Sequence, residues 1–223
     1  MFDFSERLKK AGIKHFANDN VAELVKEDDQ AQMIKALTEK MGEVLDVLGI
    51  DYLNDHNTQE TPKRIAKSWV NDLFHGRYTS APPIKEFDND RNYDGMIMIG
   101  PIAVKSMCAH HFLEIAGHCY VGVHPGKKVI GLSKYNRIVS WFSRRPQIQE
   151  DLTKQIADFL YEKMDAKGVA VYIRAEHHCM KHRGVEQNSM TTTSVLLGDF
   201  RESYSLKQEF FDLVKLNEKQ QMI

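Results

Sequence analysis

The sequence predicts an α+β protein in which a helical N-terminal region precedes a sheet domain. Apolar residues recur at helical spacing from Gln30 to Leu48 and again after Thr61. After Gly95 the pattern changes to short apolar runs separated by turn residues, and Val169 to Met180 alternates with a period of two. We therefore expect an N-terminal arm over 1–28, a helical region over 29–94 and a sheet domain over 95–223.

Composition narrows the class of protein. The 223 residues are 42% hydrophobic and 27% charged, with a net charge of −1, which is ordinary for a globular chain. This charge gives no general attraction to nucleic acid, so any anion site must be local. Cys108, Cys119 and Cys179 are too few for a secreted disulfide framework. No apolar stretch matches a bilayer span or a signal peptide, so we expect a cytoplasmic protein without membrane or nucleic-acid partners.

Two helices are expected in the helical region. The first ends near Gly49, and the second begins at Thr61-Pro62, a favourable start because proline suits the first helical turn. Arg64 and Lys67 lie one turn apart on the second helix and could face the same anion, although solvated helix charges are the simpler explanation. The Pro- and Asn-rich segment 78–94 predicts a loop and a subdomain boundary.

Strands and two further helices are expected in the sheet domain. The apolar runs that predict strands are 96–99, 102–107, 112–123, 129–132, 169–180 and 191–197. Ser133 can cap a helix whose first turns carry Lys134 and Arg137. These residues would form either a phosphate-binding site or a solvated basic face. A helix over 148–164, ended by Gly168, has Gln149 and Glu150 in its first turn, and a helical tail follows over 204–223.

Cysteines and histidines gather in two short segments. Cys108 and His111 are three positions apart, and Cys179 follows a predicted strand, on the face that His177 shares. Three N/S ligands without an obvious fourth are typical of an open, catalytic zinc site. His110 and His177 lie beside these candidate ligands, where proton transfer would be needed. Core thiols with surface histidines, or a disulfide between the two outer cysteines, are the alternative interpretations.

Five motifs occur in an order that resembles the GTP cyclohydrolase I family, from about Gln30 to the C-terminal tail. They are TPKRIAK (61–67), MCAHHF (107–112), IGLSKYNR (130–137), RPQIQE (145–150) and HHCMKHRG (177–184). The resemblance implies the tunnelling fold (T-fold) for 95–223, an antiparallel sheet with helices on one side. It also implies a homodecamer built as a dimer of pentamers, with GTP bound at the subunit interfaces. The implied reaction opens the guanine imidazole ring, releases formate and recloses to 7,8-dihydroneopterin triphosphate.

The resemblance also implies a role for each matched residue. Zinc ligands would be Cys108, His111 and Cys179, while His110, His177 and Ser133 would be catalytic. The substrate-binding positions would be Glu150 and Gln149 for guanine, Lys134, Arg137 and Arg183 for ribose and triphosphate, and Arg64 and Lys67 as further cations. The chain departs from many members at Ala109, where they carry glutamate, and at His178, which strand alternation would point away from Cys179.

Four alternative functions are a nitrile reductase or a zinc pterin synthase of the same fold, a zinc deaminase, and a structural or regulatory oligomer. A nitrile reductase of the same fold would need a nicotinamide cofactor and no zinc, which the Cys-x-x-His and His-x-Cys motifs disfavour. A zinc deaminase would need His-x-Glu with Cys-x-x-Cys, and neither motif occurs. A structural or regulatory oligomer that is stabilised by a bound metal and has no catalytic activity would not need His110 and His177.

Overall fold

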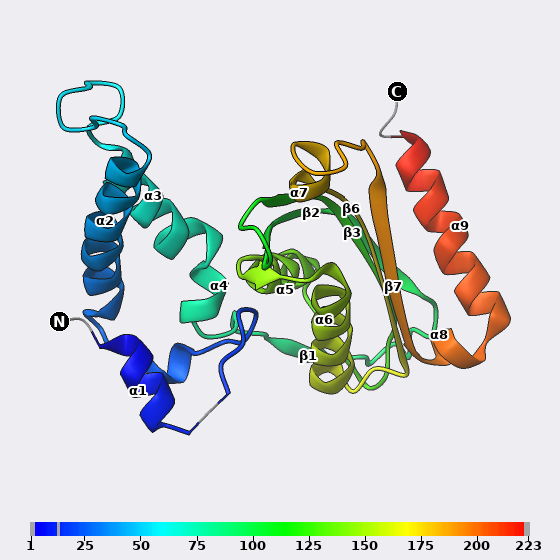
Figure 1. Cartoon of the computed structure of the whole chain (residues 1–223). Coiled ribbons are helices and arrows are strands. Elements are labelled where there is room, and N and C mark those ends of the chain that lie inside the picture. The colour runs from blue at the N-terminus through cyan, green and yellow to red at the C-terminus, as the bar shows by residue number, and fades with distance from the viewer. Residues whose placement is uncertain (1–2, 13, 221–223) are drawn as a thin grey trace. The chain divides into compact units, whose positions relative to one another are not determined.

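Helices form the first of two units of the chain, Met1–Ser80, and the second unit, Ala81–Ile223, contains the sheet. The computed structural model describes residues 3–12 and 14–220 (Figure 1). In the first unit the α-helices are α1 (Phe4–Lys10), α2 (Asp29–Val47), α3 (Thr61–Lys67) and α4 (His75–Tyr78). A 3-10 turn, η1 (Ala22–Leu24), precedes α2, and a π-helical segment, η2 (Ser68–Leu73), continues α3.

The N-terminal arm packs on its own unit through an apolar cluster and an ion pair. Phe4 and Leu8 lie on one face of α1 and are buried with Met33. Arg7 donates two hydrogen bonds to the carboxylate of Asp29, at 2.5 and 3.0 Å. Paired donors on a buried carboxylate hold two segments in one geometry, so α1 is fixed against the start of α2.

The second unit is built on a five-stranded sheet with the order β5-β2-β3-β6-β7. Its strands are β2 (Ile97–Cys108), β3 (Glu114–His124), β5 (Pro146–Gln147), β6 (Gly168–His177) and β7 (Met190–Gly198). All pairs are antiparallel except β2 with β5. A separate ribbon joins β1 (Glu86–Asp88) to β4 (Lys128–Ile130).

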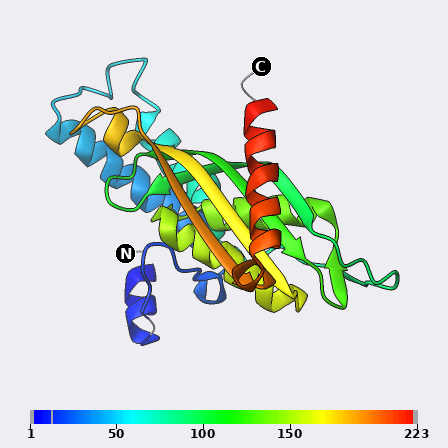
Figure 2. The same cartoon turned by 90° about the vertical axis from the view of Figure 1, so that its right-hand side faces the viewer.

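Helices cover the two faces of this sheet unequally. The helices α5 (Leu132–Ser143) and α6 (Gln149–Met164) pack on one face. On the opposite face lie α8 (Asp199–Glu202) and the long α9 (Tyr204–Gln220), which crosses the strands at an angle (Figures 1 and 2). On α6 the side chains spaced by four residues, from Leu152 to Met164, are fully buried. This period of burial is that of a helix with one face on a core.

Alternation along β6 divides the two cores. Val171 and Ile173 are fully buried beneath α5 and α6, whereas Ala170 and Tyr172 belong to the cluster under α8 and α9. The strand therefore has apolar residues on both faces, as expected for a sheet that is covered on both sides.

Several predicted boundaries were wrong. The strand expected over 169–180 ends at His177, which pairs with Ile115 near the start of β3. The pairing with β3 ends there, and the backbone continues as the helical turn α7 (His178–Lys181), in which His182 N–H donates to His178 O at 2.9 Å. The helix expected to end at Gly168 stops at Asp165, a left-handed cap, and Gly168 begins β6.

Other differences are small. Gly131, and not Ser133, is the N-cap residue of α5, and β1 lies inside the expected loop over 78–94. The two strands expected over 96–99 and 102–107 are one strand, β2, with a register shift between Ile99 and Ile102. The expected helical tail is α9, and its last predicted residues, 221–223, lie outside the described residues.

Candidate metal centre

Two segments far apart in the sequence bring three possible metal ligands together. Cys108 ends β2, His111 lies in the turn that follows, and Cys179 lies in α7. One ligand atom from each lies within 4.8 Å of the others. Cys108 is buried, Cys179 is partly buried and His111 is exposed, so the group opens on one side. Within residues 3–12 and 14–220, no other group of three His, Cys, Asp or Glu side chains has this arrangement.

The turn after β2 is held by backbone hydrogen bonds. Phe112 N–H donates to Cys108 O at 2.9 Å, and Cys108 N–H donates to Leu113 O at 2.8 Å. Phe112 has a positive φ of 50°, a conformation that is costly for a bulky side chain and clusters at functional sites. Ala109 N–H donates to Gln147 O at 2.9 Å, which fastens the turn to β5. These bonds aim Cys108 and His111 to the same side.

The strand β3 sets the separation between the two ligand-bearing segments. It lies between β2 and β6, with Met107 opposite Glu114 and Ile115 opposite His177. Gly117 on β3 lies opposite Ala175 on β6, and a Cβ at Gly117 would fall 2.2 Å from the carbonyl oxygen of Arg174. The two strands therefore approach closely here because position 117 has no side chain.

Histidine and arginine side chains surround the three ligands. His110 Nδ1 lies 3.7 Å from Cys108 Sγ, and Arg183 Nη1 donates to His111 Nε2 at 2.8 Å. Burial lowers the pKa of His177, against the opposing effect of the Glu150 charge. Burial also raises the pKa of the Cys179 thiol, and Cys108 adds to this effect. A bound cation would favour the thiolate instead.

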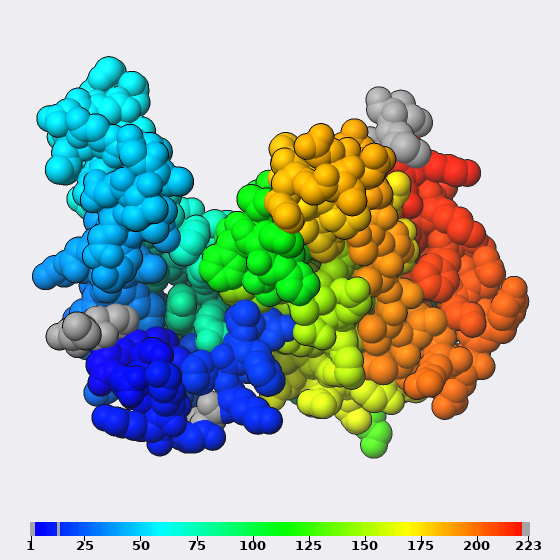
Figure 3. Space-filling model, in the orientation of Figure 1, coloured from blue at the N-terminus to red at the C-terminus, as the bar shows by residue number. Residues whose placement is uncertain are grey.

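The ligands open into a pocket of about 470 Å³. In Figure 3 the gold atoms of α7 and the residues after it lie beside the green atoms of the β2–β3 turn on this side of the unit. The lining residues are Cys108, His110, His111, Gln147, Ile148, Gln149, Glu150, His177, Cys179, Met180, Arg183, Gly184, Val185 and Thr191. This volume lies in the range of small-molecule sites.

The pocket joins most but not all of the predicted site residues. Ser133, Lys134 and Arg137 lie on the first turns of α5 and do not line it. Arg64 and Lys67 lie on α3, in the other unit. Six lining residues were not predicted from the sequence: Gln147, Ile148, Met180, Gly184, Val185 and Thr191. Gln147 is a fully buried polar residue between apolar neighbours, and its place beside Gln149 in the RPQIQE motif was the only available signal.

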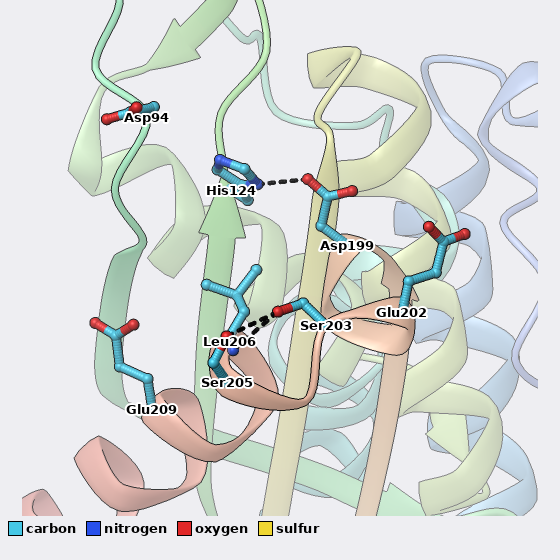
Figure 4. Close-up of a pocket in the computed structure, with 8 residues that line it drawn as sticks. All are labelled: Asp94, His124, Asp199, Glu202, Ser203, Ser205, Leu206 and Glu209. Atoms are coloured by element: carbon cyan, nitrogen blue, oxygen red, sulfur yellow. Dashed lines mark hydrogen bonds and ion pairs between the residues drawn. The ribbon is translucent and has the colours of Figure 1, made fainter.

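A second hollow, of about 510 Å³, lies at the other end of β3 (Figure 4). His124 ends that strand there and forms a hydrogen bond with Asp199, at 2.6 Å between Nδ1 and Oδ2. Carboxylates from Asp94, Glu202 and Glu209 also line it. None of the three candidate ligands lies there, and His124 is at the opposite end of the 11-residue strand from Glu114, which is at the end nearest the metal group.

Two thiols and an imidazole fit zinc better than magnesium or calcium, which prefer oxygen ligands. Three protein ligands also leave a position for water or substrate, as in catalytic zinc sites.

No helix among the described residues combines the length and the apolar character that a membrane crossing requires.

Known proteins resemble the chain over most of its length. The sequence model of the family described as GTP cyclohydrolase I matches residues 37–215. A protein of Haemophilus ducreyi named GTP cyclohydrolase 1 is 36% identical over 212 residues, or 94% of this chain and 96% of that protein. A protein of the same name from Aeromonas salmonicida is 44% identical over 177 residues, or 78% of this chain and 81% of that protein.

Proposed function

Because the chain belongs to the GTP cyclohydrolase I family, we propose that zinc held by Cys108, His111 and Cys179 supports the hydrolytic opening of GTP. The products would be formate, from C8 of the guanine ring, and 7,8-dihydroneopterin triphosphate. The observation that carries the proposal is the convergence of these three ligands in one pocket with His110, His177 and Glu150. When bound, zinc supplies a Lewis acid that lowers the pKa of water toward neutrality.

Side chains around the ligands would select guanine and move protons. Glu150 is exposed and lines the pocket, so its carboxylate can accept from N1–H and the 2-amino group of guanine. Adenine lacks this pair of donors and would leave the carboxylate unpaired. His110 lies beside Cys108 and is suited to protonating the N7 side of the purine. His177, partly buried in the same pocket, would serve the ring opening and the later proton transfers together with Ser133.

The triphosphate would be bound by cations both outside this pocket and at its lining. Ser133, Lys134 and Arg137 lie at the N-terminal turns of a 12-residue helix, where the helix dipole and free N–H groups favour anions. Their place outside the pocket of their own chain is compatible with a pocket completed by a neighbouring copy. Arg183 lines the pocket itself, and Arg64 and Lys67 would add further positive charge.

A ring of copies would give such shared sites. Among the described residues, no strand pairs with the outer side of β7, and β5 covers β2 only at Met107 and Cys108. Unpaired strand edges are ready to pair with another chain. We propose that these edges pair between subunits in pentamers, two of which form a decamer.

A metal-controlled turnover assay tests the proposal. Purified protein is incubated with GTP, with and without chelator and zinc re-addition, while formate and the fluorescence of the oxidised pterin are followed. Both products should vanish on chelation and return with zinc. ATP serves as the matched substrate control and should give neither product.

Variants separate the ligands from ordinary cysteines. Cys179→Ala should lose bound zinc and turnover, whereas Cys119→Ala, in the core of the sheet, should keep both. His110→Ala should keep zinc and lose formate release. Full turnover by Cys179→Ala, or by the chelated protein, would refute the proposed zinc chemistry.

A further inference from the structure

Gln149, the first residue of α6, has no solvent exposure and uses its side-chain amide entirely within the protein. Its Nε2 donates to the carbonyl oxygens of Ile173 and Thr191, at 3.2 and 3.1 Å, and to Thr193 Oγ1 at 3.1 Å. Its Oε1 lies 2.8 Å from His177 Nε2. The amide therefore links the start of α6 to three places: Ile173 within β6, the strand β7, and His177 at the end of β6.

The orientation of this amide is fixed by its partners. Ile173 O and Thr191 O can only accept, so they must face the amide nitrogen and not its oxygen. Thr153 Oγ1 donates to the backbone oxygen of Gln149 at 2.7 Å, so in its 2.6 Å contact with Thr193 Oγ1 the donor is Thr193. Thr193 Oγ1 is then left to accept from the Gln149 amide. A flipped amide would place oxygen against two carbonyl oxygens.

This orientation determines which nitrogen of His177 carries the hydrogen. An amide oxygen only accepts hydrogen bonds, so His177 Nε2 must be the donor. In the neutral ring the other nitrogen, Nδ1, is then an acceptor. His177 lines the pocket that contains the metal ligands, so the ring would meet substrate with one defined tautomer and one defined orientation.

We propose that Gln149 is a positioning residue that holds the His177 ring by its Nε2–H group, so that Nδ1 serves as the proton acceptor toward substrate. This role replaces the guanine contact expected for Gln149, because its amide nitrogen already faces three acceptors and its oxygen already accepts from His177. The inference rests on the proposed function, in which His177 transfers protons.

A double-mutant cycle tests it with GTP as substrate and zinc-loaded protein. Gln149→Met keeps the size of the side chain and removes both amide groups. We expect kcat to fall about 10- to 100-fold, a part of what general acid–base catalysis contributes, while KM for GTP changes less than about twofold. In a His177→Asn background, the same Gln149→Met change should alter kcat less than about threefold, because the residue acts through His177.

Thr153→Val is the matched structural control. It removes a hydrogen bond to the backbone of Gln149 and leaves the hydrogen bond between the amide oxygen and His177 in place. It should lower stability and leave kcat within about threefold of the original protein. If Thr153→Val lowers kcat as much as Gln149→Met, Gln149 has only a structural role and the inference is overturned.

A second variant guards against a Gln149→Met protein that does not fold. Gln149→Ala leaves room for a small amide, so added acetamide should restore part of its kcat. No rescue in a folded Gln149→Ala protein overturns the inference. A tenfold rise in KM with unchanged kcat would instead assign Gln149 to guanine binding, and additive losses in the cycle would exclude action through His177. Failure of the unmutated protein to release formate would refute the proposed function and would be seen before any variant is made.

Discussion

Gly117→Ala should disturb the metal centre from inside the sheet. The added Cβ would lie 2.2 Å from the carbonyl oxygen of Arg174 and 2.5 Å from the Cα of Ala175. Both atoms are backbone and cannot rotate away. To restore ordinary contact distances, β3 and β6 must separate by about 1 Å. The residue that follows β6 by two positions, Cys179, would move with that strand.

The size of the effect follows from this displacement. Overpacking of a tight interior costs typically about 1–3 kcal/mol of folding stability, and more where backbone must move. Metal sites tolerate changes in ligand distance of only about 0.2 Å, so a shift of about 1 Å between the Cys108 and Cys179 segments should also weaken zinc binding. We expect loss of stability and loss of zinc affinity in the same variant.

Urea unfolding followed by circular dichroism measures the stability, and competition with a chromogenic chelator measures the zinc affinity. Gly131→Ser is the matched control, because its Cβ meets no atom within 4 Å and serine is a preferred N-cap residue. This control should be at least as stable as the original protein. If Gly117→Ala unfolds within about 0.5 kcal/mol of the original and binds zinc equally well, β3 does not set the ligand spacing.

Three further outcomes are expected. Hydrogen bonds from Arg7 hold the pKa of Asp29 below its ordinary value, so this stabilisation is complete above about pH 4 and is lost as the pH falls through the lowered pKa. Arg7→Met should therefore reduce the loss of unfolding free energy with falling pH over this range. An unchanged dependence of stability on pH would contradict the role of the Arg7–Asp29 pair. A thiol reagent should modify the partly buried Cys179 in metal-free protein and spare Cys119, which has no solvent exposure. Mass spectrometry of the peptides measures both, and faster modification of Cys119 would contradict the prediction. Leu160→Ala, at a fully buried position, should cost about 2–5 kcal/mol without changing zinc per chain, and denaturant unfolding with metal analysis checks both.

Local patterns in the sequence were sufficient to predict a helix or strand when the periodicity of its own apolar residues shows which face is buried. The apolar stripe from Leu152 to Met164 predicts α6 because helical periodicity is a property of the segment itself. The alternation along 169–177 predicts β6 for the same reason. The end of that strand could not be predicted, because it depends on where β3 begins to pair at Ile115.

The candidate site was predictable to a similar extent. The spacing of Cys108 and His111, with Cys179 after a strand, indicated one metal group, and their ligand atoms do lie within 4.8 Å of one another. The division into 1–28, 29–94 and 95–223 and the roles of individual site residues remain predictions. The contacts of Gln149 could not be foreseen, since they depend on Ile173 and Thr191, which are 24 and 42 positions away in the sequence.

The closeness of Cys108 and Cys179 also has a consequence for the unfolded chain. These two cysteines are 71 positions apart in the sequence, and in the fold their sulfur atoms belong to one group of ligand atoms. In the unfolded chain, bringing these two cysteines to one metal would require closing a long loop at a cost in conformational entropy, so the unfolded chain binds the metal poorly. Metal that binds only the assembled group stabilises the fold by mass action. Chelation should therefore lower the resistance of the second unit to denaturant, even in a variant such as His110→Ala.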